Sequence, residues 1–197
     1  MIVVGLTGNL ASGKSTDGRI FRKSGALVFD ADGAARKALR RGSPVYAAVP
    51  KLFGKKFLKP NGELDRKKLA WHVFMHPADL KKLNTLVHPG VIFECLKVIS
   101  RNRPRKGLLV LDVPLLFESH MQNLADFTVV VSAPTRMMIK RAVAKGVPER
   151  LARRILATQW PLARKQRLAD FVIRNSGSEK ELERQILAVI QRIKTNL

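Results

Sequence analysis

Residues 8–15 decide the fold of this chain; they read Gly8-Asn9-Leu10-Ala11-Ser12-Gly13-Lys14-Ser15. They fit the pattern G-x-x-x-x-G-K-[ST], which is typical of a phosphate-binding loop. The apolar run 2–6 before them predicts a buried strand, and residues 16–23 after them can open a helix. At such a turn the backbone N–H groups converge on a phosphate, and the helix dipole favours its negative charge. We therefore expect a phosphate site from Gly8 to Thr16, the alternative being an ordinary glycine-rich turn.

Three side chains in or near this loop have the chemistry to handle a nucleotide and a metal. Lys14 is placed to reach the β- and γ-phosphates, and the Ser15 hydroxyl to ligate Mg²⁺. Asp112 closes the apolar run 108–111, as in sites where a strand-end carboxylate supports Mg²⁺, directly or through water. The alternative for Asp112 is a simple turn residue.

The rest of the chain alternates apolar strand-like runs with helical patterns. Further strands are expected at 26–29, 108–111, 127–131 and 171–173. Helices are expected at 64–74, 77–87, from His88-Pro89 to about 100, 135–145, 148–159 and near the C-terminus. In that last helix Leu182, Ile186, Val189, Ile190 and Ile193 fall on one face.

Strands separated by helices predict an α/β fold, with a parallel sheet, flanking helices and the phosphate-binding loop at its edge. The stretch 34–104 is too long and too helical for a simple crossover, so we expect an inserted helical lobe there. A smaller helical insertion is expected at 134–168. Residues 1–33, 105–133 and 169–197 then form the nucleotide-binding core.

Asp30 and Asp32 follow the second expected strand, at the edge where open α/β sheets place their sites. Residues two apart on an extended segment point the same way, so one carboxylate could act as a base toward an acceptor. We favour Asp32 as the base and Asp30 as a structural or Mg²⁺-water partner. The alternative is that either carboxylate caps a helix beginning near Ala34.

Cations in the second insertion could cover a transferring phosphoryl group. Arg136, Arg141, Lys145 and Arg153 lie there, and Arg141 and Lys145 are four apart on one helical face. A mobile cationic lid would neutralise charge and exclude water; the alternative is a solvated basic helix. His88, just before a proline, is either a ligand contact or a capping or packing residue.

The composition is that of a folded protein of 197 residues, 46% of them hydrophobic. Its single cysteine, Cys95, fits a reducing cytosol, with core packing as its expected role. No apolar run approaches the roughly 18 residues of a membrane span, and the start lacks the basic region of a signal peptide. We therefore expect a soluble, cytoplasmic protein without membrane contact.

The charge is strongly positive: 37 Lys and Arg against 15 Asp and Glu give +22. Residues 33–62 hold eight basic and no acidic residues, and 134–168 hold ten basic residues with Glu149 as the sole acid. Such fields attract polyanions. The two regions either face phosphates or are solvated surface.

Several separated motifs together resemble the dephospho-CoA kinase family almost end to end. They are the opening Gly5 to Thr16, Asp30-Ala31-Asp32 with Arg36, Gly62-Glu63-Leu64-Asp65-Arg66 with Leu69, Val73-Phe74, Leu83-Asn84, His88-Pro89, Asp112-Val113-Pro114-Leu115-Leu116-Phe117-Glu118, Gln159, Ala169-Asp170 and Asn175. The segment 112–118 is the most specific of them outside the loop.

The resemblance implies ATP-dependent phosphorylation of the ribose 3′-hydroxyl of dephospho-CoA, with Mg²⁺ as cofactor and a monomer or weak homo-oligomer. It assigns the base role to Asp32, phosphate binding to Lys14, a lid role to Arg141 and the neighbourhood of adenine to Asn175. It implies substrate contacts at Arg36, Asp65, His88, Pro114, Leu115, Phe117 and Glu118.

The chain departs from the family pattern at several positions. Asn9 and Ala11 replace glycines, and Asp17 stands where an apolar residue is usual; Met138, Lys145 and Arg174 replace an expected glutamine, arginine and acid. Phosphate binding should survive if the loop needs no positive φ at Asn9 and Ala11.

Two other functions compete with this one. A kinase for another nucleotide-like acceptor would keep the fold and change the substrate. A nucleic-acid-binding NTPase would explain the charge, but one Tyr and two Trp are few for base stacking, and no guanine-reading Asn-Lys-x-Asp motif is apparent.

Overall fold

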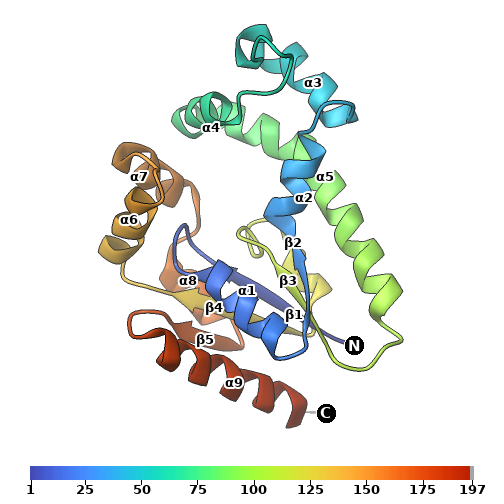
Figure 1. The fold of residues 1–197 in the computed structure, drawn as a ribbon, viewed down its shortest axis with the longest axis vertical. Coiled ribbons are helices and arrows are strands. Elements are labelled where there is room, and N and C mark those ends of the chain that lie inside the picture. Colours follow the sequence, from blue (N-terminus) through green and yellow to red (C-terminus); the bar gives the residue numbers. More distant parts are fainter. Residues whose placement is uncertain (196–197) are drawn as a thin grey trace.

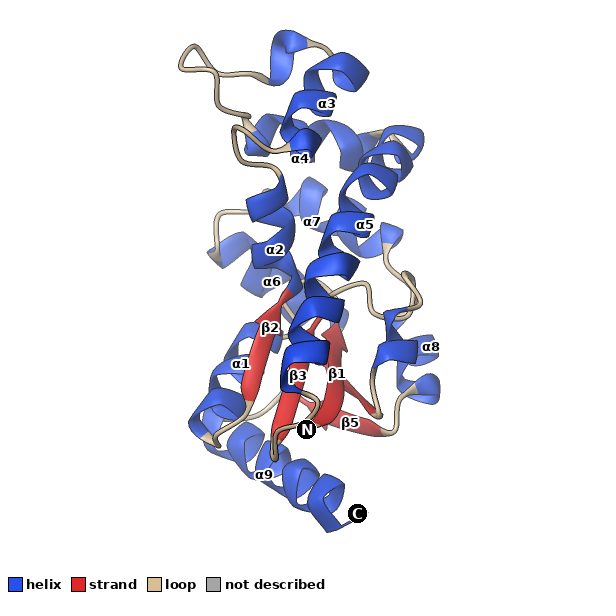
Figure 2. Ribbon diagram, turned by 90° about the vertical axis from the view of Figure 1, so that its right-hand side faces the viewer, coloured by secondary structure: helices blue, strands red, loops and turns tan. Residues whose placement is uncertain are grey.

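The computed structural model describes residues 1–195, except for the side chain of Ser15. A five-stranded parallel sheet forms the centre, in the order β2-β3-β1-β4-β5 (Figures 1 and 2). The strands are β1 (Ile2–Gly8), β2 (Leu27–Asp30), β3 (Leu108–Asp112), β4 (Phe127–Ser132) and β5 (Phe171–Arg174). The expected parallel α/β sheet is confirmed.

Helices cover both faces of the sheet and rise above one edge. In chain order they are α1 (Lys14–Lys23), α2 (Ala31–Ala38), α3 (Pro44–Phe53), α4 (Arg66–Met75), α5 (Pro77–Asn102), α6 (Thr135–Ala144), α7 (Glu149–Thr158), α8 (Leu162–Leu168) and α9 (Glu179–Thr195), with 3-10 turns η1 (Lys55–Phe57) and η2 (Met121–Leu124). No helix within residues 1–195 is long and apolar enough to cross a membrane.

The alternation of side chains along the buried strands divides the core between the two faces. Val4, Leu6 and Val110 point to the face covered by α1 and α9, where Ile186 is fully buried. On the opposite face Leu109 and Leu111, from the same strand as Val110, pack against α5 through Val87, Val91, Cys95 and Ile99. Cys95 is fully buried, in agreement with a packing role.

Helices α2 to α5, which we call the helical lobe, rise above the carboxyl edge of the sheet, while the second half of α5 runs down along one face of the sheet (Figure 1). The outer part of this lobe has its own small core, formed by Val49, Phe53, Phe57, Leu64, Leu69 and Val73. Asp65 caps α4, because its side chain accepts the Lys68 N–H at 3.0 Å. Helices α6 to α8 form what we call the second insertion; α6 and α7 face the lobe across this edge, and α8 lies beside β4 (Figure 1).

The prediction that His88-Pro89 breaks a helix is wrong. α5 runs without interruption from Pro77 to Asn102, with Pro89 inside it. A proline there removes the hydrogen bond to the carbonyl of residue 85, at a cost of about 3 kcal/mol. The helix continues because its apolar stripe packs on the sheet on both sides of the proline, at Val87 and Val91.

Candidate active site

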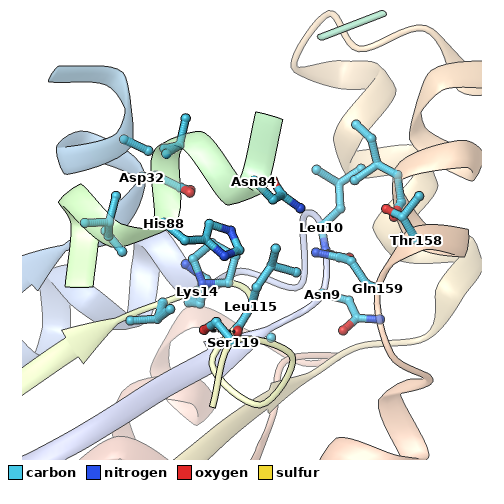
Figure 3. A pocket seen from close by; sticks show the side chains of 18 of the residues that line it. Asn9, Leu10, Lys14, Asp32, Asn84, His88, Leu115, Ser119, Thr158 and Gln159 are labelled. Atoms are coloured by element: carbon cyan, nitrogen blue, oxygen red, sulfur yellow. Dashed lines mark hydrogen bonds between the residues drawn. The ribbon is translucent and has the colours of Figure 1, made fainter. Parts of the chain in front are cut away.

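A cavity of about 530 Å³ lies at the carboxyl edge of the sheet, between the helical lobe and the second insertion (Figure 3). Residues 8–14 of the phosphate loop form its floor, and Asp32 and His88 line it from α2 and α5. Thr158 and Gln159 at the end of α7 close the opposite side. Parallel strands bring their carboxyl ends together at this edge, which explains why distant segments meet here.

The phosphate loop is tightly packed at its two glycines. A Cβ on Gly8 would lie 2.5 Å from the Ser12 Oγ, and one on Gly13 would lie 1.6 Å from the Asn175 Nδ2. Gly13 also has a φ of 111° and begins α1, which starts at Lys14. Only glycine fits at this position, which explains why the loop pattern has a glycine directly before Lys14.

Ala11 adopts a left-handed backbone conformation, so the condition set from the sequence, that the loop needs no positive φ there, is not met. Its φ is 54°, one of two positive values among the non-glycine residues that the structure describes. The loop therefore does need a positive φ at Ala11, where the resemblance leads us to expect glycine, and Ala11 bears a steric cost of about 1–2 kcal/mol there.

Lys14 and Asp112 form an ion pair across the site. The Lys14 Nζ bonds the Asp112 Oδ1, and both side chains are mostly buried. Asp112 lies at the end of β3, opposite Leu6 of β1, which places its carboxylate beside the loop. Burial raises the pKa of Asp112, and Lys14 opposes that rise. The lysine thus neutralises the mostly buried carboxylate.

The structure separates the carboxylates of Asp30, the last residue of β2, and Asp32, in the first turn of α2. Asp30 caps α2: its Oδ1 accepts the Gly33 N–H at 2.9 Å, and its Oδ2 pairs with Arg36 at 3.2 Å. Asp32 lines the cavity (Figure 3). The expectation that both lie on an extended segment is wrong, because α2 begins at Ala31. Because the chain turns into a helix after Asp30, the side chains of Asp30 and Asp32 do not point the same way, as they would on one strand.

Asp17, in the first turn of α1, is an unusual buried carboxylate. It has no exposed surface, and neither oxygen finds a hydrogen-bond partner among the side chains that the structure describes. Burial and repulsion from Asp112 raise the pKa of Asp17 to about 7, while Lys14 and Arg141 oppose the rise. The group is therefore partly protonated at neutral pH.

Arg141 and Asn175 support the phosphate loop from behind rather than lining the cavity. The Asn175 Nδ2 donates to the Ser12 carbonyl at 2.8 Å, and the Arg141 Nη1 donates to the same oxygen at 3.3 Å. Arg141 also donates to the Asn175 Oδ1 at 3.4 Å. Arg141 was expected in a lid over the phosphoryl group and Asn175 near the adenine of ATP; in the structure both side chains contact the Ser12 carbonyl of the phosphate loop.

The expected substrate residues divide into two groups. His88, Pro114 and Leu115 line the cavity, and burial lowers the pKa of His88. The other four do not line it: Arg36 pairs with Asp30, Asp65 caps α4, Phe117 is buried, and Glu118 pairs with Lys165.

Apart from His88, the mainly apolar wall that α5 gives to the cavity was not predicted as a site. It includes Leu80, Leu83, Asn84, Val87, His88 and Val91 of α5. The signal was present, because these positions are three or one apart and share one helical face. Lys145 at the end of α6 also lines the cavity, whereas Met138 is buried.

Comparison with known proteins agrees with this geometry. A family model described as dephospho-CoA kinase matches residues 2–181. A relative from Geobacillus kaustophilus named dephospho-CoA kinase is 41% identical over 192 residues, covering 96% of each protein. The solved dephospho-CoA kinase from Campylobacter jejuni is 28% identical with a TM-score of 0.72, covering 99% of this chain and 98% of that one. A shikimate kinase from Acinetobacter baumannii, 19% identical with a TM-score of 0.54, shares the fold alone. The chain belongs to the dephospho-CoA kinase family.

Proposed function

We infer that this chain transfers the γ-phosphoryl group of ATP to the ribose 3′-hydroxyl of dephospho-CoA, giving coenzyme A and ADP. The observation that carries this inference is the shared cavity, in which a phosphate loop and the carboxylate of Asp32 face a long apolar wall. A nucleotide phosphate and an acceptor with an extended, weakly polar arm can be held there together.

In the reaction, a bond forms between the 3′-oxygen and the γ-phosphorus while the bond to the ADP oxygen breaks. Asp32 accepts the proton of the 3′-hydroxyl as it attacks. Lys14 exchanges Asp112 for the β- and γ-phosphate oxygens, and Arg141 stabilises the transferring group through the loop it contacts. ADP then leaves with the electrons of the broken bond.

The residues present suit a Mg²⁺ ion. Asp112 supplies a mostly buried carboxylate whose hydrogen-bond partner is Lys14, so a cation can take over when Lys14 moves to phosphate. We propose that Asp112, directly or through water, and Ser15 hold this ion; the Ser15 side chain lies outside the described part of the structure. Bound there, Mg²⁺ supplies charge neutralisation on the β- and γ-phosphates.

We propose that the lobe of residues 34–104 binds the acceptor, with His88, Pro114 and Leu115 bordering it. Residues 134–168 act as a lid that carries Lys145 into the cavity, and 1–33, 105–133 and 169–197 form the nucleotide-binding core. ATP and dephospho-CoA are the partners of a monomer or weak homo-oligomer in the cytoplasm. The free, buried Cys95 is compatible with that reducing compartment.

The test is replacement of the base. Asp32→Asn should lower kcat by about 10²- to 10⁴-fold, because a general base contributes that much. Its matched control is Asp30→Asn, which weakens a helix cap and an exposed ion pair two residues away and should leave kcat nearly unchanged. An Asp32→Asn enzyme as fast as the parent would refute the base assignment. A parent that phosphorylates a nucleoside monophosphate and ignores dephospho-CoA would refute the acceptor.

A further inference from the structure

Three segments far apart in the sequence are joined beside the cavity. They are the start of the phosphate loop, the loop that follows β3, and the connection from α7 through α8. Their contacts form a unit that we call the joint, made of Asn9, Leu10, Pro114, Glu118, Gln159, Trp160 and Lys165.

A buried ion pair is the centre of the joint. The Lys165 Nζ lies 2.8 Å from the Glu118 Oε1, and the Lys165 side chain has no exposed surface. The same Nζ donates to the Pro114 carbonyl at 3.2 Å. Burial lowers the pKa of Lys165, and Glu118 opposes that shift. The carboxylate of Glu118 therefore helps to keep the buried lysine charged.

The connection between α7 and α8 is held by the same carboxylate. The Trp160 N–H donates to the Glu118 Oε1 at 2.9 Å. The Arg164 guanidinium covers the Trp160 ring, with its carbon 3.5 Å from the ring centroid. Glu118 therefore fixes both the backbone at Trp160 and the side chain of Lys165.

On its other side the connection is bonded to the phosphate loop. The Leu10 N–H donates to the Gln159 Oε1 at 2.9 Å, and the Asn9 Nδ2 donates to the Trp160 carbonyl at 3.2 Å. Leu10 and Gln159 both line the cavity (Figure 3). Movement at Trp160 would thus be transmitted to the backbone that faces the phosphates.

Stability alone does not explain such a pair. Removing two charges from water has a desolvation cost, and the attraction between the charges often does no more than balance it. A protein with an apolar pair of similar volume in their place can be more stable. What the pair supplies is directional bonding to two backbone groups, Trp160 N–H and Pro114 C=O, which apolar side chains cannot provide.

We propose that Glu118 and Lys165 are positioning residues, which hold the second insertion across the phosphate loop and keep the loop and the Pro114–Leu115 wall in register for phosphoryl transfer. Glu118 thus acts through the joint rather than as a substrate contact. The kinetic part of this proposal rests on the proposed function; the structural part can be measured without it.

The experiment uses Trp160 as a reporter in full-length protein. Trp71→Phe, in the helical lobe, leaves Trp160 as the only tryptophan. In that background Glu118→Gln and Lys165→Met should raise the acrylamide quenching of Trp160. They should also lower kcat about 10- to 100-fold with KM for dephospho-CoA changed far less, since small misplacements act on the transition state.

The matched control is Glu149→Gln, which removes the exposed Arg153–Glu149 pair of the same insertion and should change neither readout. A double variant, Glu118→Leu with Lys165→Met, separates positioning from folding. It should unfold at a temperature close to that of the parent or higher, yet keep the raised quenching and the low kcat. Parental kcat in this double variant, or parental quenching in both single variants, would overturn the proposal.

The two proposals fail differently. If the parent does not phosphorylate dephospho-CoA while the joint variants still raise quenching relative to Glu149→Gln, the proposed function falls and the joint stands. If the parent is active and the joint variants match it in both readouts, the joint falls and the function stands.

Discussion

The backbone at Ala11 shows how one residue can oppose the loop in which it lies. Its φ of 54° is a conformation that glycine adopts freely and that costs an L-residue about 1–2 kcal/mol. The loop adopts it anyway, because the bonds at Ser12 and the close packing at Gly8 and Gly13 determine the turn around it.

Ala11→Gly should therefore raise the free energy of unfolding by about 1 kcal/mol, since glycine relieves the left-handed strain and gives back part of the gain as chain entropy. The control is Ala188→Gly, at an exposed position inside α9, which should lower stability by about 1 kcal/mol. Urea unfolding of both variants checks the opposite signs. A loss of stability in both would show that Ala11 is unstrained.

The buried carboxylate of Asp17 should make the stability of the protein depend on pH. Its pKa is about 7 in the folded protein and near 3.8 when unfolded, so the folded state binds more protons between these values. Proton binding by Asp17 therefore stabilises the folded state. The stabilisation is fully present below pH 3.8 and is lost as pH rises to 7, by about 4 kcal/mol in total. Asp17→Asn cannot titrate, so its advantage over the parent should grow from pH 5 to pH 8. Urea unfolding at both pH values measures this, and a constant difference would contradict the shifted pKa.

At the scale of elements, the strands and the polar residues at their ends could be predicted from the sequence. A buried strand appears as a local apolar run, and parallel strands all end at the same edge of the sheet. Asp112 beside Lys14 and Asp32 at the cavity follow from that edge. The Glu118–Lys165 pair could not be predicted, since 47 residues separate its partners and only tertiary packing brings them together. Local signals also misled at Pro89, where packing overrides a helix breaker.

The continuity of α5 carries its own prediction. Pro89→Ala restores the N–H donor toward the carbonyl of residue 85, and should stabilise the protein by about 1–3 kcal/mol. Pro77→Ala is the control, because Pro77 occupies the first position of the same helix, where no intrahelical donor is needed. Thermal unfolding of both variants is the measurement. An equal effect of the two substitutions would mean that Pro89 costs the helix nothing.

At the scale of the whole molecule, most of the +22 charge is solvated surface rather than part of the site. Of the ten basic residues in 134–168, Lys145 lines the cavity, Arg141 contacts the loop and Lys165 is buried in the joint. The others in this insertion include Arg150, Arg153 and Arg154, which are exposed on α7. A surface with so few acids repels itself, and this repulsion opposes the compact state.

Salt should therefore stabilise this protein. Raising NaCl from about 20 to 200 mM shortens the Debye length from roughly 20 Å to below 10 Å, which screens the repulsion and should raise the midpoint of thermal unfolding. Over the same range KM for ATP should rise, because the field that attracts the polyanion weakens with the repulsion. Calorimetry and initial rates at matched salt measure the two effects. A midpoint that falls with salt would mean that the surface ion pairs, such as Arg153–Glu149 and Arg19–Glu179, outweigh the like-charge repulsion.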